Sequence, residues 1–160
     1  MDHTREQFII SQADAARSNV ENIFPIDPIL VGKTYGLQVF TTSLPRNVSG
    51  QIFYQERKIF IEATDYITRQ AFSIAHEIGH FILHNDGTSH TSQRDTGSSL
   101  GIDEKEMEAN LFAANLLMPQ NEVLRLVGYN YTLDSMASYF GVSSLAMQYR
   151  LNNLGIAVYV

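Results

Sequence analysis

The segment from Ala75 to Phe81 constrains the fold most, because it places two histidines and a glutamate inside an apolar stretch. Residues 71–75 and 81–83 on either side are largely apolar, which indicates a buried helix. On a helix, His76 and His80 lie about 6 Å apart along the axis and about 40° apart in azimuth. Both imidazoles can therefore reach one metal ion.

Glu77 follows the first histidine directly, so its carboxylate can contact a water bound to the ion instead of the ion itself. This order of residues is the HExxH arrangement of zinc metallopeptidases. Buried polar groups need partners, and a divalent cation with its water satisfies all three side chains at once. The alternative is a pair of core histidines hydrogen-bonded to the backbone. We expect Zn²⁺, or another divalent metal, with Glu77 as the general base.

A catalytic zinc needs a third protein ligand and an open position for water. His84 is a poor candidate, because a straight helix places it about 12 Å from the first histidine. Segment 107–118 is apolar on nearly every face, so the charge of Glu108 within it is costly without a cation. We therefore expect Glu108 as the third ligand, and interpret Glu104 and Glu106 as favourable charges at a helix N-terminus. The alternative for Glu108 is an ion pair with Arg or Lys in the core.

The composition further limits the possible nucleophiles and metal ligands. The 160 residues include no cysteine, which excludes disulfides, thiol nucleophiles and cysteine-ligated metal. Any zinc is then held by imidazole and carboxylate, a ligand set that suits a catalytic site. With 17 acidic and 11 basic side chains, the net charge of −6 argues against binding to nucleic acid.

The chain shows neither a signal-peptide pattern nor an apolar run near the roughly 20 residues that span a membrane. We expect a cytoplasmic protein without membrane contact, folded as one domain over 1–160. We expect three parts along the chain. Residues 1–63 form N-terminal helices and a small sheet, and residues 64–118 form the metal-binding helices, which a loop at 85–103 connects. Residues 119–160 form the C-terminal helices.

The local patterns predict an α+β fold, because strand signals precede helix signals. The strands are expected at 37–44, 50–56 and 58–63, the last two as a hairpin in a mostly antiparallel sheet. Helices are expected at 4–21, at 28–36 after an Asp27 cap, from a Thr64 or Asp65 cap to 81 or 84, from an Asp103 cap to 117, from Pro119 onward, and at 133–140 and 144–153.

The substrate and the developing oxyanion also need binding groups. We expect an extended peptide to pair by strand addition along hairpin 50–63. The alternative is that the apolar residues of this hairpin face the core: Ile52, Tyr54, Ile59 and Ile61. Four side chains can donate to an oxyanion, and the sequence does not choose among them: His84, His90, Tyr149 and Arg150.

Two segments together resemble the ImmA/IrrE family of metallopeptidases: FSIAHEIGHFILH at 72–84 and EANLFAANLLMP at 108–119. The first is common to zincins, whereas the second, with its Leu-Leu-Met-Pro ending, is more specific. The resemblance implies a zincin-like fold in which the sheet packs on the HExxH helix. It implies His76, His80 and Glu108 as metal ligands and Glu77 as the catalytic base.

The resemblance also implies a protein substrate, namely a helix-turn-helix repressor or antitoxin that controls phage, mobile-element or stress genes. A second class of function rests on segment 133–151, which looks like a helix-turn-helix. The chain would then be a non-catalytic regulator that binds DNA or protein. Arg150 is the one basic residue between 133 and 155, which favours packing of a catalytic domain over binding to phosphates.

Overall fold

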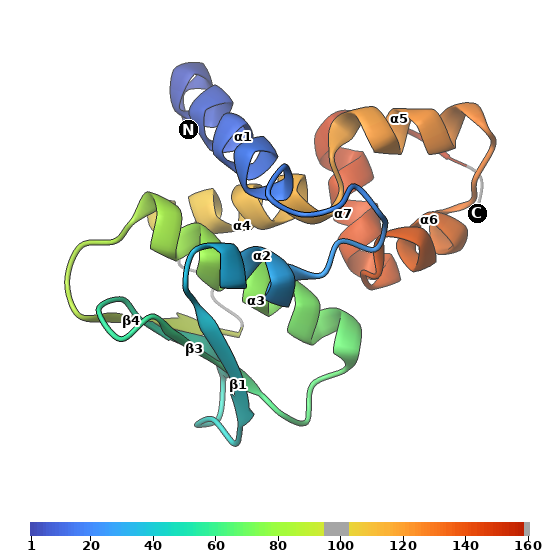
Figure 1. Ribbon diagram of the computed structural model, residues 1–160. Helices are drawn as coiled ribbons and strands as arrows, with labels where there is room; N and C mark the ends of the chain where they lie inside the picture. Colours follow the sequence, from blue (N-terminus) through green and yellow to red (C-terminus); the bar gives the residue numbers. More distant parts are fainter. Residues whose placement is uncertain (95–102, 159–160) are drawn as a thin grey trace.

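The computed structural model describes residues 1–94 and 103–158 (Figure 1). The helix with the HExxH motif, α3 (Ile67–Leu83), lies between a four-stranded sheet and the helix α4 (Glu104–Leu117). Residues 73–81 of α3 are all buried, as expected for a helix covered on both sides. On the outer side, α1 (His3–Arg17) packs against α4, and α2 (Pro28–Thr34) packs against α3.

The sheet has the strand order β1-β3-β2-β4. Its strands are β1 (Gln38–Thr42), β2 (Val48–Phe53), β3 (Lys58–Glu62) and β4 (Ser89–Gln93). The β1/β3 pair is parallel, whereas β2 pairs antiparallel with both β3 and β4. The expected α+β fold, with a small and mostly antiparallel sheet, is confirmed.

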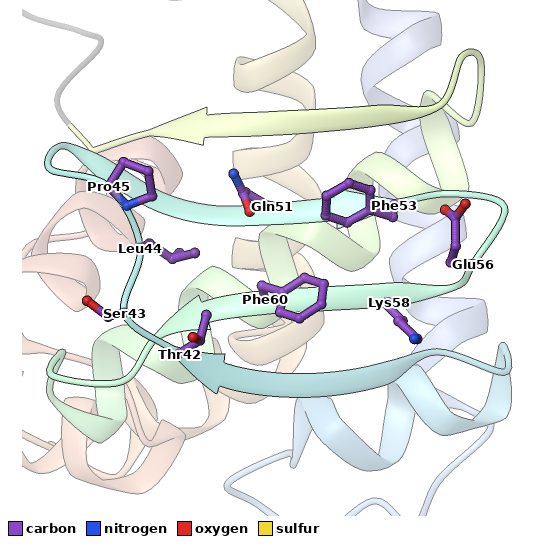
Figure 2. Close-up of a pocket in the computed structure, with 9 residues that line it drawn as sticks. All are labelled: Thr42, Ser43, Leu44, Pro45, Gln51, Phe53, Glu56, Lys58 and Phe60. Carbon is purple, nitrogen blue, oxygen red and sulfur yellow. The ribbon is translucent and has the colours of Figure 1, made fainter.

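The sheet buries one face and exposes the other. Ile52, Ile59 and Ile61 point toward α3 and are fully buried, and Tyr54 is buried beside them, so the core interpretation of these side chains is correct. Figure 2 shows the opposite face, where a hollow is lined by side chains that include Phe53 and Phe60. None of the candidate site residues lines this hollow.

The expected strand addition along hairpin 50–63 does not fit this topology. β3 is paired on both sides by β1 and β2, and β2 is paired on both sides by β3 and β4. Within the described part of the chain, the free edges of the sheet belong to β1 and β4. The long loop expected at 85–103 is also wrong in part, because residues 89–93 form β4; residues 95–102 lie outside the described residues.

The helix boundaries follow the expected caps at most positions. The carboxylates of Asp27 and Asp103 cap α2 and α4. α3 begins after Tyr66 with no side-chain cap, so the Thr64 and Asp65 caps are wrong. The first helix ends at residue 17, four residues before the expected end, with Ser18 as its C-cap.

Three helices complete the chain: α5 (Gln120–Gly128), α6 (Leu133–Phe140) and α7 (Ser144–Leu154). α6 and α7 form the helix-turn-helix-like segment, and Gly141 between them adopts φ 67°, which glycine tolerates. Both helices bury apolar side chains, among them Phe140 and Leu151. No helix in the described ranges is long and apolar enough to cross a membrane.

Candidate metal centre

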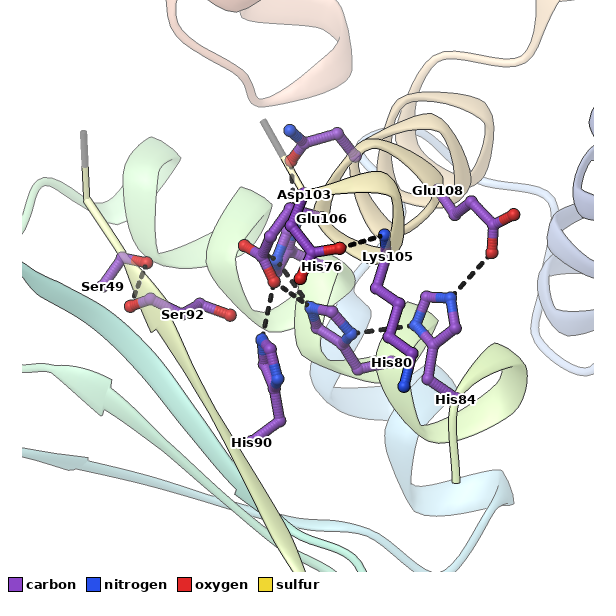
Figure 3. Close-up of polar contacts among 11 residues, drawn as sticks. Ser49, His76, His80, His84, His90, Ser92, Asp103, Lys105, Glu106 and Glu108 are labelled. Atoms are coloured by element: carbon purple, nitrogen blue, oxygen red, sulfur yellow. Dashed lines mark hydrogen bonds and ion pairs between the residues drawn. The ribbon is translucent and has the colours of Figure 1, made fainter. Parts of the chain in front are cut away.

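Three side chains from α3 and α4 converge at one point. The Nε2 atoms of His76 and His80 are 3.1 Å apart, and the carboxylate of Glu106 lies 3.2 Å from the first and 2.7 Å from the second. All three residues are buried. Figure 3 shows both imidazoles directed at the Glu106 carboxylate, which enters from the first turns of α4.

These side chains are close enough to share one zinc ion, with the Glu106 Oε2 nearest to His76 and its Oε1 nearest to His80. Bonds of roughly 2.0–2.1 Å at tetrahedral angles separate neighbouring ligand atoms by about 3.3 Å. The three separations between the imidazole nitrogens and the carboxylate range from 2.7 to 3.2 Å. Two imidazoles and one carboxylate also leave a fourth position open, as a catalytic zinc requires.

The tautomer of His76 supports the same arrangement. Its Nδ1 lies 2.8 Å from the Asn110 Oδ1, which only accepts hydrogen bonds, so Nδ1–H donates to it. Burial disfavours the charged form of His76, but the hydrogen bond between its Nε2 and Glu106 raises its pKa overall. With an ion bound, the neutral imidazole would present the lone pair of Nε2 to that ion. Asn110 comes from α4, one turn beyond Glu106.

Glu77 lies beside this centre without a partner. Among the described residues, both of its carboxylate oxygens are buried and make no hydrogen bond. The side chain reaches β2 at Gly50, where an added Cβ would come within 2.9 Å of the Glu77 Oε1. Burial raises the pKa of Glu77 above its usual value. A carboxylate with these properties accepts a proton more readily than an exposed glutamate does.

The electrostatics of the ligands follow from burial and mutual contact. Burial lowers the pKa of His80 to about 4, which favours the neutral form that binds metal. Burial opposes ionisation of Glu106, but contacts with His76, His80 and His90 hold its pKa well below the usual range. The centre therefore combines an ionised carboxylate with a neutral imidazole.

Glu108, the expected third ligand, lies outside this cluster, and Glu106 stands with the two histidines in its place. The Glu108 carboxylate accepts hydrogen bonds from the Arg5 Nε and Nη2, both at 2.8 Å, and lies 2.7 Å from the His84 Nε2. These contacts hold the pKa of Glu108 at about 2. Its charge is thus balanced by an arginine, the alternative that the sequence left open.

Three of the four candidate oxyanion donors lie apart from the open position. His84 is enclosed between His80 and Glu108, and Tyr149 is 60% exposed without a hydrogen bond to the centre. Arg150 is buried, and its guanidinium donates to the Met118 carbonyl and the Asn115 Oδ1, both at 3.0 Å. It therefore braces the end of α4 and is not exposed to bind phosphates.

His90, on the edge strand β4, is the candidate that reaches the centre. Its Nε2 lies 2.6 Å from the Glu106 Oε1, and the centre of its ring lies 4.0 Å from that of His80. The side chain is half-buried, and contact with Glu106 raises its pKa. A hydrogen-bond donor therefore stands on the strand that borders the centre.

The chain has clear relatives among known proteins. Residues 33–152 match the model of the Peptidase M78 family, described as the IrrE N-terminal-like domain. The chain is 30% identical over 97 residues to metallopeptidase ImmA of Bacillus subtilis (strain 168), which covers 59% of this chain and 56% of that protein. It is 28% identical over 118 residues to uncharacterized immunity region protein 2 of Bacillus phage phi105, with 72% and 73% covered.

A solved structure shares the fold. The chain matches a Mycobacterium tuberculosis transcriptional regulator with a TM-score of 0.63 and 17% identity, over 94% of this chain and 47% of that chain. This likeness concerns the fold alone. The chain spans about half the length of both ImmA and the solved regulator.

Proposed function

Because the chain belongs to the Peptidase M78 family, that of the IrrE N-terminal-like domain, we propose that it is a zinc-dependent metalloendopeptidase. One observation carries this proposal: the buried carboxylate of Glu77, which has no hydrogen-bond partner among the described residues, lies beside three side chains that could hold one metal ion. His76, His80 and Glu106 would hold the ion. A zinc ion so held supplies a Lewis acid for the scissile carbonyl and lowers the pKa of a bound water.

Glu77 is the proposed general base. It takes a proton from the attacking water and passes it to the nitrogen of the leaving amine. Its raised pKa supports both steps, because a carboxylate that is too acidic would hold the proton too weakly. The absence of a hydrogen-bond partner in the described part of the chain leaves its oxygens available for water.

The substrate is proposed to bind as an extended peptide along the free edge of β4. An edge strand offers unpaired backbone groups, so main-chain hydrogen bonds can hold a peptide there. His90 lies on this strand and reaches the centre, and we assign it the stabilisation of the oxyanion. The arrangement would bring the scissile bond between His90 and Glu77.

We propose a helix-turn-helix repressor or antitoxin as the protein substrate, in a system that controls phage, mobile-element or stress genes. The similarity to ImmA and to an immunity region protein of a phage supports this assignment. DNA binding by segment 133–151 is not favoured, since Arg150, its one basic residue, is buried.

The test compares the parent chain with Glu77→Gln in cleavage of a helix-turn-helix repressor encoded by a neighbouring gene. We expect the parent to contain one zinc ion and to cleave, and Glu77→Gln to retain zinc while cleavage falls at least about 100-fold. Glu56→Gln, at an exposed position, is the control and should cleave like the parent. Equal cleavage by Glu77→Gln, or purified parent without affinity for zinc, would overturn the proposal.

A further inference from the structure

A chain of polar side chains leads away from the centre, on the side of His80 opposite Glu106. The His80 Nδ1 lies 3.0 Å from the His84 Nδ1, and the His84 Nε2 lies 2.7 Å from the Glu108 Oε1. Glu108 in turn accepts two hydrogen bonds from Arg5, both at 2.8 Å. Figure 3 shows His84 standing between His80 and Glu108.

The direction of each hydrogen bond follows from the last acceptor. An ionised carboxylate only accepts, so His84 must donate from Nε2–H to Glu108. A neutral His84 then carries a lone pair on Nδ1, which makes it an acceptor for its neighbour. His80 can then donate from Nδ1–H to His84, and with an ion in the centre the lone pair of its Nε2 would face that ion, between Nε2 and the Glu106 Oε1 that lies 2.7 Å away.

Arg5 holds in place the Glu108 carboxylate, the acceptor on which this direction of hydrogen bonding depends. Both Glu108 and His84 are buried, and an uncompensated carboxylate at such a position is costly. The two parallel hydrogen bonds from one guanidinium fix the position of the carboxylate. Without Arg5, the Glu108 carboxylate would be free to turn away, and His84 would lose its fixed acceptor.

We propose that Arg5, Glu108 and His84 form a relay of positioning residues that locks His80 in the tautomer and ring orientation required to bind the metal ion. This inference rests on the proposed function, because it gives His80 the role of a metal ligand. The relay begins on α1, at residues 3–17, whereas the family model matches residues 33–152. A helix outside the matched region thus takes part in forming the centre.

The test measures the zinc affinity of the full chain by competition with a chromophoric chelator. We expect His84→Leu and Arg5→Met each to weaken zinc binding by about 10- to 100-fold, the usual effect of losing a partner of a metal ligand. Arg17→Met is the matched control: Arg17 also joins α1 to α4, through the Asn115 carbonyl at 2.7 Å, but has no contact with the relay. It should bind zinc like the parent.

A second measurement identifies which nitrogen of each histidine in the relay is protonated. Long-range ¹H–¹⁵N spectra of the imidazoles should show His84 protonated at Nε2 with and without zinc, and His80 protonated at Nδ1 when zinc is bound. In His84→Leu, the Nδ1 proton of His80 should exchange rapidly with water. Thermal unfolding of each metal-free variant separates loss of the relay from loss of the fold.

The outcomes separate the two proposals. A parent chain that binds no zinc would overturn the proposed function, and the metal-free spectra would still decide the relay. Zinc affinity unchanged in both His84→Leu and Arg5→Met, or a His84 protonated at Nδ1, would overturn the relay and leave the proposed function intact.

Discussion

Gly50 controls the position of the proposed base at the scale of a single residue. Its missing side chain makes room for Glu77, because a Cβ would come within 2.9 Å of the Glu77 Oε1 and 3.1 Å of the Ile61 Cδ1. We predict that Gly50→Ala displaces the carboxylate and lowers kcat/KM by about 100-fold, as misplacement by about 1 Å can do. Zinc content should remain that of the parent.

The assay compares cleavage rates and zinc content of Gly50→Ala with those of Gly128→Ala. Gly128 ends α5 and has open space where a Cβ would stand, so its substitution should leave both quantities unchanged. Parent-like cleavage by Gly50→Ala would show that Glu77 is not held by this contact.

Two carboxylates that are two residues apart have different expected roles. We predict that Glu106→Gln removes stoichiometric zinc, because the amide replaces the anionic ligand of the proposed site. Glu108→Gln should keep one zinc per chain with reduced affinity, since its carboxylate contacts Arg5 and His84. Zinc analysis after gel filtration measures both. The opposite pattern would restore Glu108 as the ligand.

The sequence predicted that His76 and His80 lie together with Glu77 beside them, because the relation among these three residues is local. Residues one helical turn apart face the same side whatever the rest of the fold does. Glu106 and Glu108, in contrast, point about 200° apart around α4, so the choice between them depends on which side of α4 meets α3. One local signal was present: Asn110 follows Glu106 by one turn and places a second polar group on that side.

At the scale of the elements, the contact between α3 and α4 determines which side of α4 faces the histidines. Gly79 lies between the two histidines of α3, and an added Cβ would meet Phe112 of α4 at 3.1–3.2 Å. Phe112 is fully buried and has little room to move. The close approach of the two helices at this point brings the carboxylate of α4 to the imidazoles of α3.

We predict that Gly79→Ala destabilises the metal-free protein, because overpacking a core usually costs about 1–3 kcal/mol. The gain in helix propensity from replacing glycine is about 1 kcal/mol and offsets part of this cost. Urea unfolding measures the difference, with Gly128→Ala as the control without a neighbouring side chain. A Gly79→Ala variant more stable than the parent would show that the two helices can separate freely.

The strand that the sequence missed, β4, shows why element prediction fails at a sheet edge. Its residues Ser89, Thr91 and Gln93 are exposed, and only Ser92 is buried. A polar sequence of this kind favours a loop by its composition. The strand forms because its backbone pairs with β2, a partner some 40 residues earlier that no local pattern indicates.

For the whole molecule, the proposed zinc ion is a link between two helices that are distant in sequence. His76 and His80 come from α3 and Glu106 from α4, so the unfolded chain has no preformed site. An ion that binds the folded chain and not the unfolded chain stabilises the fold by mass action. α1 packs against α4, and the sheet packs against α3, so the ion would connect two helices at the centre of the protein.

We therefore predict that zinc raises the unfolding temperature. At a free zinc concentration of 100 times Kd, the expected stabilisation is about 2.7 kcal/mol, and for a chain of this size it corresponds to roughly 5–10 °C. Differential scanning fluorimetry with chelator and with buffered zinc measures the shift. His76→Ala should unfold at the same temperature in both conditions, because it lacks one ligand of the proposed site. If that variant were stabilised as much as the parent, zinc would act elsewhere on the chain.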